Sequence, residues 1–497
     1  MKHNKLIAAI AEHAAQQPEK IALSTDHTTI DYATLYLAIR QQAKAWHTST
    51  GKTISLAVEN SPAWVILDLA ALECDIPLVP LPFFFSSAQW LHAIQDAGAQ
   101  VLITDHPEIF APLLAERIMQ TAQFTIADKT LTQFDLQQTH QVTLPAGTAK
   151  VTYTSGTTGN PKGVCLSADN MLKVASSITQ ASELNSLDIH LNVLPLATLL
   201  ENVAGVYAPL LAGARCIVLP SQDIGLSGAS GLDVQTLFRI LNASNATTAI
   251  FTPELLHALV LHLESGADTP THLRFLAVGG AAVSPQLIKR AKALLIPVYE
   301  GYGLSECASV VALNQRQSNR VGSVGKILPH VHVTLSDDNE IIVHNNTYLG
   351  YVGQDNPPGD TVPTGDIGYI DEAGYLFISG RKKNIFITSF GRNVSPEWVE
   401  RELKFSPNIV QAAIFGEARP WNVAIILPRG LSTTAQIDYA IQTINQHLPD
   451  YARIKRWIKA DAPFSATNQQ LTTNGRNRRE MIWQYYQDKI NALYEEV

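Results

Sequence analysis

Short apolar runs alternate with helix-like segments along most of the chain. The runs are rich in aliphatic residues and end at turn residues, as at 54–58, 101–104, 216–219 and 275–278. The segments between them, for example 64–72 and 234–241, repeat their apolar residues with helical spacing. Strands that alternate with helices predict parallel sheets covered by helices on both faces, so we expect an α/β protein.

The pattern changes near Val331. Beyond it the strands become shorter and are separated by polar turns, as at 340–343 and 375–378. This predicts a smaller antiparallel or barrel-like piece. A separate α+β segment of roughly a hundred residues begins after Arg381-Lys382-Lys383, a plausible size for a small domain. Because 497 residues exceed what one compact core supports, the sequence predicts two or more domains.

Composition narrows the class of protein. Apolar residues make up 46% of the chain and charged residues 16%, which is typical of soluble globular enzymes. The formal net charge of −8 argues against a nucleic-acid partner, which would need a broad basic face. The exception is a short basic run at Arg476, Arg478 and Arg479.

Targeting signals and cysteines give no sign of export. Residues 1–10 resemble a signal peptide only superficially and are better interpreted as a short amphipathic helix. No apolar stretch is long enough to span a bilayer. The cysteines Cys74, Cys165, Cys216 and Cys307 are scattered without metal-ligand spacing, which predicts reduced, mostly buried thiols. We expect a cytoplasmic location and no transmembrane segment.

The strongest local signal runs from Thr152 to Val164, after the strand-like segment 150–153. Its glycines and small hydroxyl residues let the backbone approach a polyanion and supply N–H and O–H donors. Lys162 adds a point charge for phosphate. It is followed by Gly163, whereas a Walker loop needs Ser or Thr there. A flexible turn is the ordinary interpretation of a glycine-rich loop, but so many specified positions in order favour a phosphate loop.

Further motifs follow in order along the chain. They are Gly279-Gly280-Ala281-Ala282, Tyr302-Gly303-Leu304-Ser305-Glu306, Thr364-Gly365-Asp366-Ile367-Gly368 and Gly380-Arg381-Lys382-Lys383. With the phosphate loop they resemble the adenylate-forming superfamily of acyl-CoA synthetases, peptide-synthetase adenylation domains and firefly-type luciferases. This resemblance implies a large AMP-binding (adenylation) domain at 1–382, with parallel sheets and a small β-barrel-like subdomain. It also implies a small mobile α+β domain at 383–497 that rotates about Lys383.

The resemblance and the side-chain chemistry together predict a nucleotide site. Tyr302 would stack on the base, Ser305 would donate to the α-phosphate and Glu306 would hold Mg²⁺. The residues expected to contact ATP or the thiol are Thr154, Ser155, Gly156, Thr157, Thr158, Gly159, Lys162, Gly279, Gly280, Ala281, Tyr302, Gly303, Ser305, Asp366, Arg381 and Gly391. Asp366 and Arg381 would bind the ribose. Lys162, Glu306 and Arg476 are the expected catalytic residues, and Glu306 is the expected metal ligand.

The implied reaction has two steps. A carboxylate attacks the α-phosphate of ATP and expels pyrophosphate, and a thiol of coenzyme A or of a carrier-protein pantetheine then takes the acyl group. Positioning and charge neutralisation would do most of the work. The stretch 390–400 resembles the part of the family that lines the pantetheine tunnel, where a side chain at Gly391 would obstruct the thiol arm. Gly391 is equally consistent with a turn before a helix that starts at Ser395-Pro396-Glu397.

One departure from the family pattern concerns the catalytic lysine. The family ends in a Leu-Thr-x-x-Gly-Lys-type motif, whereas this chain has Arg476 at the lysine position, after Leu471-Thr472-Thr473-Asn474-Gly475. Arginine keeps the charge but is longer, planar and forked, so the exchange is not conservative at a tight site. We expect Arg476 to serve as a phosphate clamp, since every other nucleotide motif is intact. Loss of the adenylation step is the alternative.

The substrate is less well defined. Segments 194–201 and 394–397 look more like fatty acyl-CoA synthetases than amino-acid-activating domains, which favours a fatty acid and leaves an aryl acid open. Thr198 and Ala168 stand where the family often has histidine, so substrate gating cannot be carried over. An apolar acyl pocket would be lined from 199–211 and 277–303, although core residues would look the same.

Two other functions stay open. One is an enzyme of the same superfamily that activates a β-hydroxy acid for closure to a β-lactone. The other is a nucleotide- or adenylate-binding protein with impaired adenylation, for which Arg476 is the only support.

Overall fold

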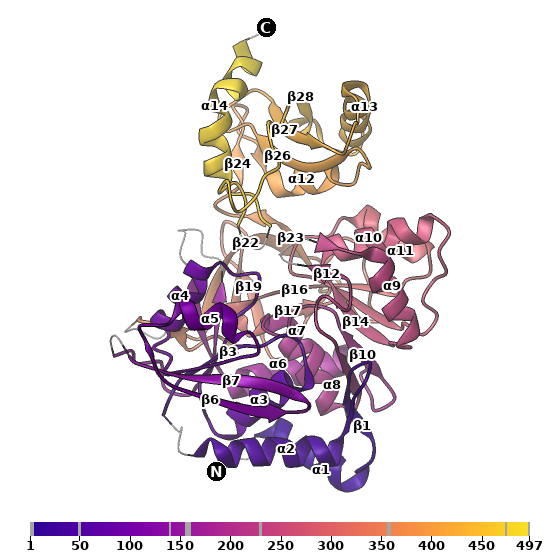
Figure 1. The fold of residues 1–497 in the computed structure, drawn as a ribbon. Coiled ribbons are helices and arrows are strands. Elements are labelled where there is room, and N and C mark those ends of the chain that lie inside the picture. Colours follow the sequence, from indigo (N-terminus) through magenta and orange to yellow (C-terminus); the bar gives the residue numbers. More distant parts are fainter. Residues whose placement is uncertain are drawn as a thin grey trace. The chain divides into compact units, whose positions relative to one another are not determined.

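The elements of the computed structural model fall into two units (Figure 1). The structure describes residues 4–47, 51–138, 141–154, 161–227, 231–354, 359–472 and 475–495. Unit 1 comprises Met1–Ala281, Lys289–Thr334 and Val343–Val362, and unit 2 comprises Ala282–Ile288, Leu335–Ile342 and Pro363–Val497.

A nine-stranded sheet in unit 1 has its parallel strands at the centre. Its order is β18 (Lys326–Ile327), β17 (Ser309–Leu313), β16 (Val298–Leu304), β15 (Phe275–Val278), β14 (Thr248–Phe251), β10 (Ile189–Asn192), β11 (Arg215–Val218), β1 (Ile21–Ser24) and β2 (Thr29–Asp31). Strands β16, β15, β14, β10, β11 and β1 run parallel, while β2, β17 and β18 are antiparallel additions at the two ends. The carboxyl ends of parallel strands share one edge, where α/β proteins place ligands.

An eight-stranded sheet is the second frame of unit 1. Its order is β21 (Gly350–Tyr351), β9 (Lys162–Ser167), β8 (Thr148–Thr154), β4 (Leu78–Pro80), β3 (Ile54–Ala57), β5 (Val101–Thr104), β7 (Lys129–Leu136) and β6 (Ile118–Ile126). Strands β8, β4, β3 and β5 are parallel, and β9 folds back antiparallel on β8. A two-stranded ribbon of β12 (Leu226–Ser227) and β13 (Gly231–Leu232) stands apart from both sheets.

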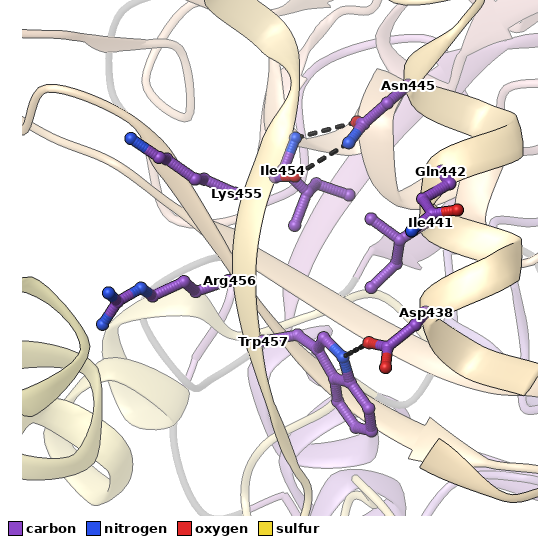
Figure 2. A pocket seen from close by; sticks show the side chains of 8 residues that line it. All are labelled: Asp438, Ile441, Gln442, Asn445, Ile454, Lys455, Arg456 and Trp457. Carbon is purple, nitrogen blue, oxygen red and sulfur yellow. Dashed lines mark hydrogen bonds between the residues drawn. The ribbon is translucent and has the colours of Figure 1, made fainter. Parts of the chain in front are cut away.

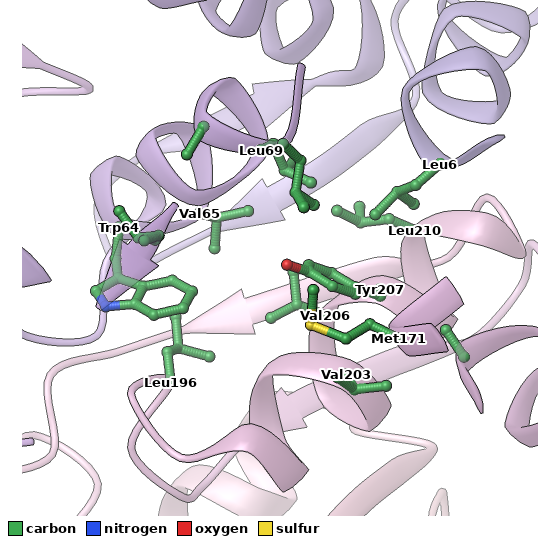
Figure 3. Close-up of a cluster of buried hydrophobic side chains, with 14 of the residues drawn as sticks. Leu6, Trp64, Val65, Leu69, Met171, Leu196, Val203, Val206, Tyr207 and Leu210 are labelled. Atoms are coloured by element: carbon green, nitrogen blue, oxygen red, sulfur yellow. The ribbon is translucent and has the colours of Figure 1, made fainter. Parts of the chain in front are cut away.

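Helices bury the apolar side chains between these sheets. Those packed in the main core are α1 (Lys5–Gln16), α2 (Tyr32–Ala45), α3 (Pro62–Glu73), α6 (Ala168–Ala181), α7 (Leu199–Asn202), the π-helix η2 (Val203–Tyr207) and α8 (Ala208–Leu211). Trp64, Val65 and Leu69 of α3 pack in the same cluster as Val206 and Tyr207 of η2 (Figure 3). Ser61 caps α3 and Pro62 fills its first turn, a combination that favours the start of a helix. Further helices in the described residues before 310 are α4 (Ser87–Asp96), α5 (Pro107–Leu113), α9 (Val234–Ala243), α10 (Pro253–Glu264), α11 (Pro285–Ala293) and the 3₁₀ turn η3 (Ser305–Cys307).

The C-terminal part of the chain builds smaller sheets. Strands β19 (His332–Leu335), β20 (Glu340–His344), β22 (Thr361–Ile370) and β23 (Leu376–Arg381) form a four-stranded sheet in this order, and β24 (Phe386–Ile387) pairs with β25 (Asn393–Val394). In unit 2 a three-stranded sheet has the order β26 (Ile409–Phe415), β27 (Asn422–Pro428) and β28 (Ile454–Lys459). Helices α12 (Pro396–Leu403) and α13 (Thr434–Asn445) contribute to one apolar cluster against this sheet, and α14 (Arg479–Glu495) contributes to another. A 3₁₀ turn, η4 (Asp450–Ala452), precedes β28.

The predicted elements compare well with this architecture. The apolar runs at 54–58, 101–104, 216–219 and 275–278 correspond to β3, β5, β11 and β15, and the helical segments 64–72 and 234–241 lie within α3 and α9. The chain has the expected mixed α/β fold, with a large N-terminal part of mostly parallel sheets and a smaller C-terminal part. The boundary at 382/383 stays a prediction.

Two smaller expectations are also answered. The amphipathic helix predicted at the N-terminus is α1, which continues to Gln16 and buries Leu6, Ile7 and Ile10. Three of the four cysteines are buried, and Cys74 is partly exposed. In the parts of the chain that the structure describes, no helix has the length and apolar character needed to cross a membrane.

Candidate active site

The two ends of the predicted phosphate loop face each other. Thr154 ends β8 and Lys162 begins β9, and the register of the two strands pairs these two residues. Thr154 is half-buried and Lys162 is exposed. The predicted site residues Ser155, Gly156, Thr157, Thr158 and Gly159 lie outside the described residues. The described geometry therefore fixes the two ends at which the loop is anchored.

The two glycine motifs lie on neighbouring parallel strands. Gly279, Gly280 and Ala281 follow β15 directly, and β16 carries Tyr302 and Gly303 beyond the last residue that it pairs with β15. Gly280 has a φ of +82°, which favours glycine. A Cβ on Gly279 would lie 3.4 Å from the carbonyl oxygen of Gly301. The structure thus brings these two predicted motifs to one edge of the nine-stranded sheet.

Gly303 is required by the packing of the backbone. A Cβ at this position would lie 1.5 Å from the carbonyl oxygen of Ser309 on the adjacent strand β17. The β16–β17 register also shifts between Tyr302 and Gly303. The glycine of this motif consequently has a structural reason that is independent of any ligand.

Glu306 and Lys162 are joined by a tyrosine that the sequence analysis did not single out. The Tyr351 hydroxyl donates a hydrogen bond to Glu306 Oε1 over 2.9 Å. The Lys162 ammonium lies over the Tyr351 ring, 5.2 Å from its centroid. Ser305 and Glu306 form the short 3₁₀ turn η3 after β16, and Glu306 is half-buried. Three side chains of unit 1 therefore form one cluster with a cation, a phenol and a carboxylate.

Asp366 and Arg381 form a pair in unit 2. They are partners in the β22–β23 register, and Arg381 Nε lies 2.8 Å from Asp366 Oδ1. Arg381 also donates a hydrogen bond from Nη1 to the Thr364 carbonyl over 2.8 Å. Gly365, which stands between Thr364 and Asp366 in the chain, has a φ of +70°. The predicted ribose carboxylate is thus buried and already oriented by the predicted ribose arginine.

Arg476 lies within electrostatic reach of that pair. The Thr472 amide donates to the Arg476 carbonyl over 2.8 Å, and the turn closes at Gly475, whose φ is +72°. Desolvation, together with repulsion from Arg381, lowers the pKa of Arg476, while Asp366 and Glu397 act in the opposite direction. Desolvation, Arg381 and Arg476 likewise lower the pKa of Lys383. Three cations and the two carboxylates Asp366 and Glu397 therefore share one electrostatic environment, in which the excess of positive charge suits an anionic ligand.

A buried glutamate anchors this turn, and sequence reasoning missed it. Glu400 accepts hydrogen bonds from Asn477 Nδ2 over 3.1 Å and from Arg479 Nη2 over 2.6 Å. It also accepts from the Ile414 amide over 2.7 Å. Arg479 of the predicted basic run therefore has a structural role beside Glu400. A glutamate on a helix looks like a solvated acid in sequence, so nothing in the pattern identified it.

Gly391 and the start of α12 are explained by local structure. Gly391 has a φ of +71° and open space where a Cβ would lie. Pro396 and Glu397 occupy the first turn of α12 as expected, but the Ser395 side chain does not cap this helix. Its hydroxyl lies 3.4 Å from a Glu397 oxygen instead. The turn interpretation accounts for Gly391, and the pantetheine interpretation stays a prediction.

The segment proposed to line an acyl pocket contributes heavily to the core. Leu199, Val203, Val206 and Leu210 are buried in the main hydrophobic cluster. Figure 3 shows Val203 and Leu210 close to Met171 and Leu6 within this cluster. Thr198 precedes α7 and donates its hydroxyl hydrogen bond to the Pro195 carbonyl over 2.6 Å. Ala168 begins α6, which Ser167 caps.

A hollow of about 350 Å³ lies in unit 2, and none of the predicted site residues lines it (Figure 2). It is lined by α13 and β28, and its polar groups are largely paired. Trp457 Nε1 donates to Asp438 over 2.7 Å, and the Asn445 amide bonds to both backbone groups of Ile454. The predicted site residues carry the chemistry of phosphate and nucleotide binding, and the residues that line this hollow include none of them.

Comparison with protein families shows two family models that match the chain. The family model described as AMP-binding enzyme matches residues 10–352, and the model described as AMP-binding enzyme C-terminal domain matches residues 383–497. The chain belongs to the AMP-binding enzyme family.

Named relatives of this family member are ligases with different acids. A long-chain-fatty-acid–CoA ligase, FadD15 of Mycobacterium bovis, is 23% identical over 99% of this chain and 97% of its own length. A 2-succinylbenzoate–CoA ligase of Bacillus subtilis is 24% identical over 95% of this chain and 98% of its own length. The resemblance to the adenylate-forming superfamily is confirmed by these matches.

Solved structures confirm the fold of the family. MatB of Rhodopseudomonas palustris, solved with ATP, has a TM-score of 0.77 at 22% identity and covers 98% of this chain and 99% of its own. The anthranilate CoA ligase AuaEII, solved with anthranoyl-AMP, has a TM-score of 0.78 at 16% identity and covers 97% of this chain and 96% of its own. The chain thus has the adenylate-forming enzyme fold.

The fit of a magnesium ion can be judged from Glu306. Among the residues that the structure describes, no group of three or more histidines, cysteines or acids could form a dedicated metal cage. Mg²⁺ does not require one, because it commonly binds one or two carboxylates together with substrate phosphates and water. The half-buried Glu306 carboxylate, with one oxygen bonded to Tyr351, fits that mode of binding.

Proposed function

We propose that the protein is an AMP-forming acid–thiol ligase. It would activate a carboxylic acid with ATP, release pyrophosphate and pass the acyl group from the acyl-adenylate to a thiol. The observation that carries this proposal is the match of the AMP-binding enzyme model over residues 10–352, followed by its C-terminal domain model. The ligase names of the relatives support the thiol as the second acceptor.

In unit 1 the proposed roles are positioning and neutralisation of the phosphates. Lys162 and the hydroxyls of Thr154 and Ser305 would bind phosphate oxygens, and Tyr302 would stack on the adenine beside Gly279–Ala281. Glu306 would hold a magnesium ion, which on binding neutralises phosphate charge. These groups lower the barrier by orienting ATP and by stabilising charge as it moves to pyrophosphate. Neighbouring positions on β15, β16 and η3 support this assignment.

In unit 2 the proposed roles are ribose binding and stabilisation of the acyl-phosphate region. Asp366, aligned by Arg381 at 2.8 Å, would accept hydrogen bonds from the ribose hydroxyls. Arg476 would clamp the α-phosphate and the substrate carboxylate in place of the family's lysine. The cations Arg381 and Lys383 within electrostatic reach of Arg476 support this role, because they make the region attractive to anions.

The substrate that we propose is a medium- or long-chain fatty acid. It is supported by FadD15, whose match spans 99% of this chain, and by the sequence of segments 194–201 and 394–397. The succinylbenzoate, oxalate and indoleacetate ligases among the relatives make aryl and short acids necessary members of the test panel. Coenzyme A is the proposed acceptor, a carrier-protein pantetheine is the alternative, and the cytoplasm is the proposed location.

The first experiment measures acid-dependent release of pyrophosphate from Mg-ATP across fatty, aryl and dicarboxylic acids. We expect release by the wild type, and thioester and AMP once coenzyme A is added. Arg476→Met should lower kcat by about 10²–10³-fold, the effect of removing one donor to a developing charge. Arg476→Lys should retain activity, because a cation remains at the position.

The matched control is Arg478→Met, which removes the same charge two residues away and should leave kcat within about twofold, as expected for a side chain outside the site. Release by Arg476→Lys alone would refute adenylation by this chain and would favour the adenylate-binding alternative. Thioester formation from a simple acid would exclude internal ring closure as the main reaction.

A further inference from the structure

The segment from Tyr348 to Val352 is bonded to the strand that follows the phosphate loop. Its strand β21 pairs antiparallel with β9 at the edge of the eight-stranded sheet, with Tyr351 opposite Val164. The Val352 amide donates to the Gly163 carbonyl over 2.9 Å, and the Leu349 amide donates to the Cys165 carbonyl over 2.8 Å. This segment therefore fixes the backbone immediately after Lys162.

The same segment holds Glu306 in two ways. The Tyr348 amide donates to the Glu306 carbonyl over 2.7 Å, and the Tyr351 hydroxyl donates to Glu306 Oε1 over 2.9 Å. The rings of Tyr348 and Tyr351 meet edge to face with their centroids 4.9 Å apart. Both the backbone and the carboxylate of Glu306 are consequently positioned by residues more than forty positions later in the chain.

The Tyr351 hydroxyl is the donor in its hydrogen bond to Glu306. A phenol that keeps its proton can donate only one hydrogen bond, and here it is directed at one oxygen of Glu306. The second carboxylate oxygen is then held in a defined direction for a metal ion.

The face of the same ring holds the charge of Lys162. Its ammonium lies 5.2 Å from the ring centroid, within the range of a cation–π contact. One rigid side chain thus contacts both the proposed metal ligand and the proposed phosphate ligand. An exposed lysine without such a contact would sample many rotamers, and ordering it on ATP binding would cost conformational entropy.

We propose that Tyr351 is a positioning residue of the adenylation step, which presents Glu306 to magnesium through its hydroxyl and Lys162 to phosphate through its ring. The inference rests on the proposed function, since it assigns these two residues to Mg-ATP. It predicts that mutations can separate the effect of the hydroxyl from the effect of the ring, because the hydroxyl acts on Glu306 and the ring acts on Lys162.

The test titrates magnesium at fixed ATP in the full-length protein and follows pyrophosphate release with the best acid of the panel. Tyr351→Phe removes only the hydroxyl and should raise the half-saturating magnesium concentration by about tenfold, as loss of a group that orients a metal ligand typically does. Its KM for ATP at saturating magnesium should stay within about twofold. Tyr351→Leu removes the ring as well and should also raise that KM.

Tyr153→Phe is the matched control. The Tyr153 hydroxyl donates to Asp96 over 2.7 Å, and Tyr153 lies on β8 opposite Gly163, on the other side of β9 from Tyr351. The substitution removes a phenol–carboxylate bond beside the same strand without touching Glu306 or Lys162. We expect its magnesium dependence to match the wild type. An equal shift in both phenylalanine variants would overturn the inference and indicate a general loosening of β9.

Binding separates this inference from the proposed function. Equilibrium binding of ATP is measured against magnesium concentration in the wild type, Tyr351→Phe and Tyr153→Phe. A shift confined to Tyr351→Phe in a protein that releases no pyrophosphate would uphold the positioning of Glu306 for Mg-ATP by Tyr351 and would reject the adenylation step and the ligase proposal. Unchanged magnesium dependence of Tyr351→Phe with intact catalysis would reject the inference alone. A wild type that binds no Mg-ATP would reject both. If Tyr351→Leu fails to fold, Tyr351→Phe still decides between these outcomes.

Discussion

Replacing Lys150 with methionine removes one charge of an ion pair in the core of unit 1. Lys150 Nζ lies 2.7 Å from Asp68 Oδ1, and both side chains are only 1% exposed. The Tyr207 hydroxyl donates to Asp68 Oδ2 over 2.7 Å and accepts from Lys150 over 2.9 Å, while Asn202 bonds to both members of the pair. Burial lowers the pKa of Lys150, and Asp68 counteracts this by stabilising the ammonium.

The expected magnitude follows from this burial. Lys150→Met leaves the Asp68 carboxylate without a counter-ion in a place that water does not reach, which costs about 3–5 kcal/mol of unfolding free energy. Asp68→Asn leaves the ammonium in the same position and should cost a similar amount. The double variant buries no net charge and keeps an acceptor for Asn202 and Tyr207, so it should lie within about 2 kcal/mol of the wild type.

Urea unfolding followed by circular dichroism, with one transition fitted for each unit, measures these differences. The exposed pair Lys173–Asp169 is the control, because its N–O distance is also 2.7 Å but its side chains are 51% and 64% exposed. Lys173→Met should cost less than about 1 kcal/mol. A Lys150→Met variant as mild as Lys173→Met, or a double variant that loses the sum of the two single losses, would refute the reasoning.

Two further predictions concern single residues of unit 1. Burial lowers the pKa of His330 to about 4 from 6.5, so its contribution to stability is complete above pH 6.5 and declines toward pH 4. His330→Gln should therefore reduce the loss of stability between pH 7 and pH 5 by about 2 kcal/mol, measured by urea unfolding at the two pH values. An equal loss in the wild type and the variant would contradict this. Gly303→Ala places a Cβ 1.5 Å from the Ser309 carbonyl oxygen and should lower the free energy of unfolding in urea by about 3 kcal/mol. Gly279→Ala places its Cβ 3.4 Å from the Gly301 carbonyl oxygen and should cost less than about 1 kcal/mol. Similar losses in both variants would exclude the steric explanation.

The sequence predicted the elements whose signal is apolar and local. Strands β3 and β15 are fully or almost fully buried, so their side chains form a continuous apolar run that is visible without any knowledge of the sheet. Strand β6 was not predicted, because most of its side chains are exposed and carry no alternating pattern. Its hairpin with β7 turns through Ala127 and Asp128, both at positive φ, instead of a recognisable Asn-Gly or Asp-Gly pair.

The candidate site divides in a similar way. Motifs that are short in sequence located Lys162, Asp366 and Arg381, and the strand registers then explain why Asp366 and Arg381 pair. Tyr351 and Glu400 could not be found by such motifs. Tyr351 lies 45 residues from Glu306, and Glu400 lies 79 residues from Arg479, so their contacts depend on strand pairing and helix packing that no local pattern specifies.

The surroundings of Arg476 change the question raised by its sequence. Lysine and arginine carry the same charge at residue 476, and Arg381 and Lys383 contribute two further positive charges beside the carboxylates Asp366 and Glu397. Attraction for the phosphates of ATP should therefore depend weakly on that exchange. What the exchange alters is geometry, since a lysine presents a compact point charge and an arginine a planar fork. Arg476→Lys should accordingly retain activity, with any change appearing in kcat while the KM for ATP stays within about twofold. An altered KM at constant kcat would show that residue 476 contributes to ATP binding in the ground state and not to the charge that develops during the reaction.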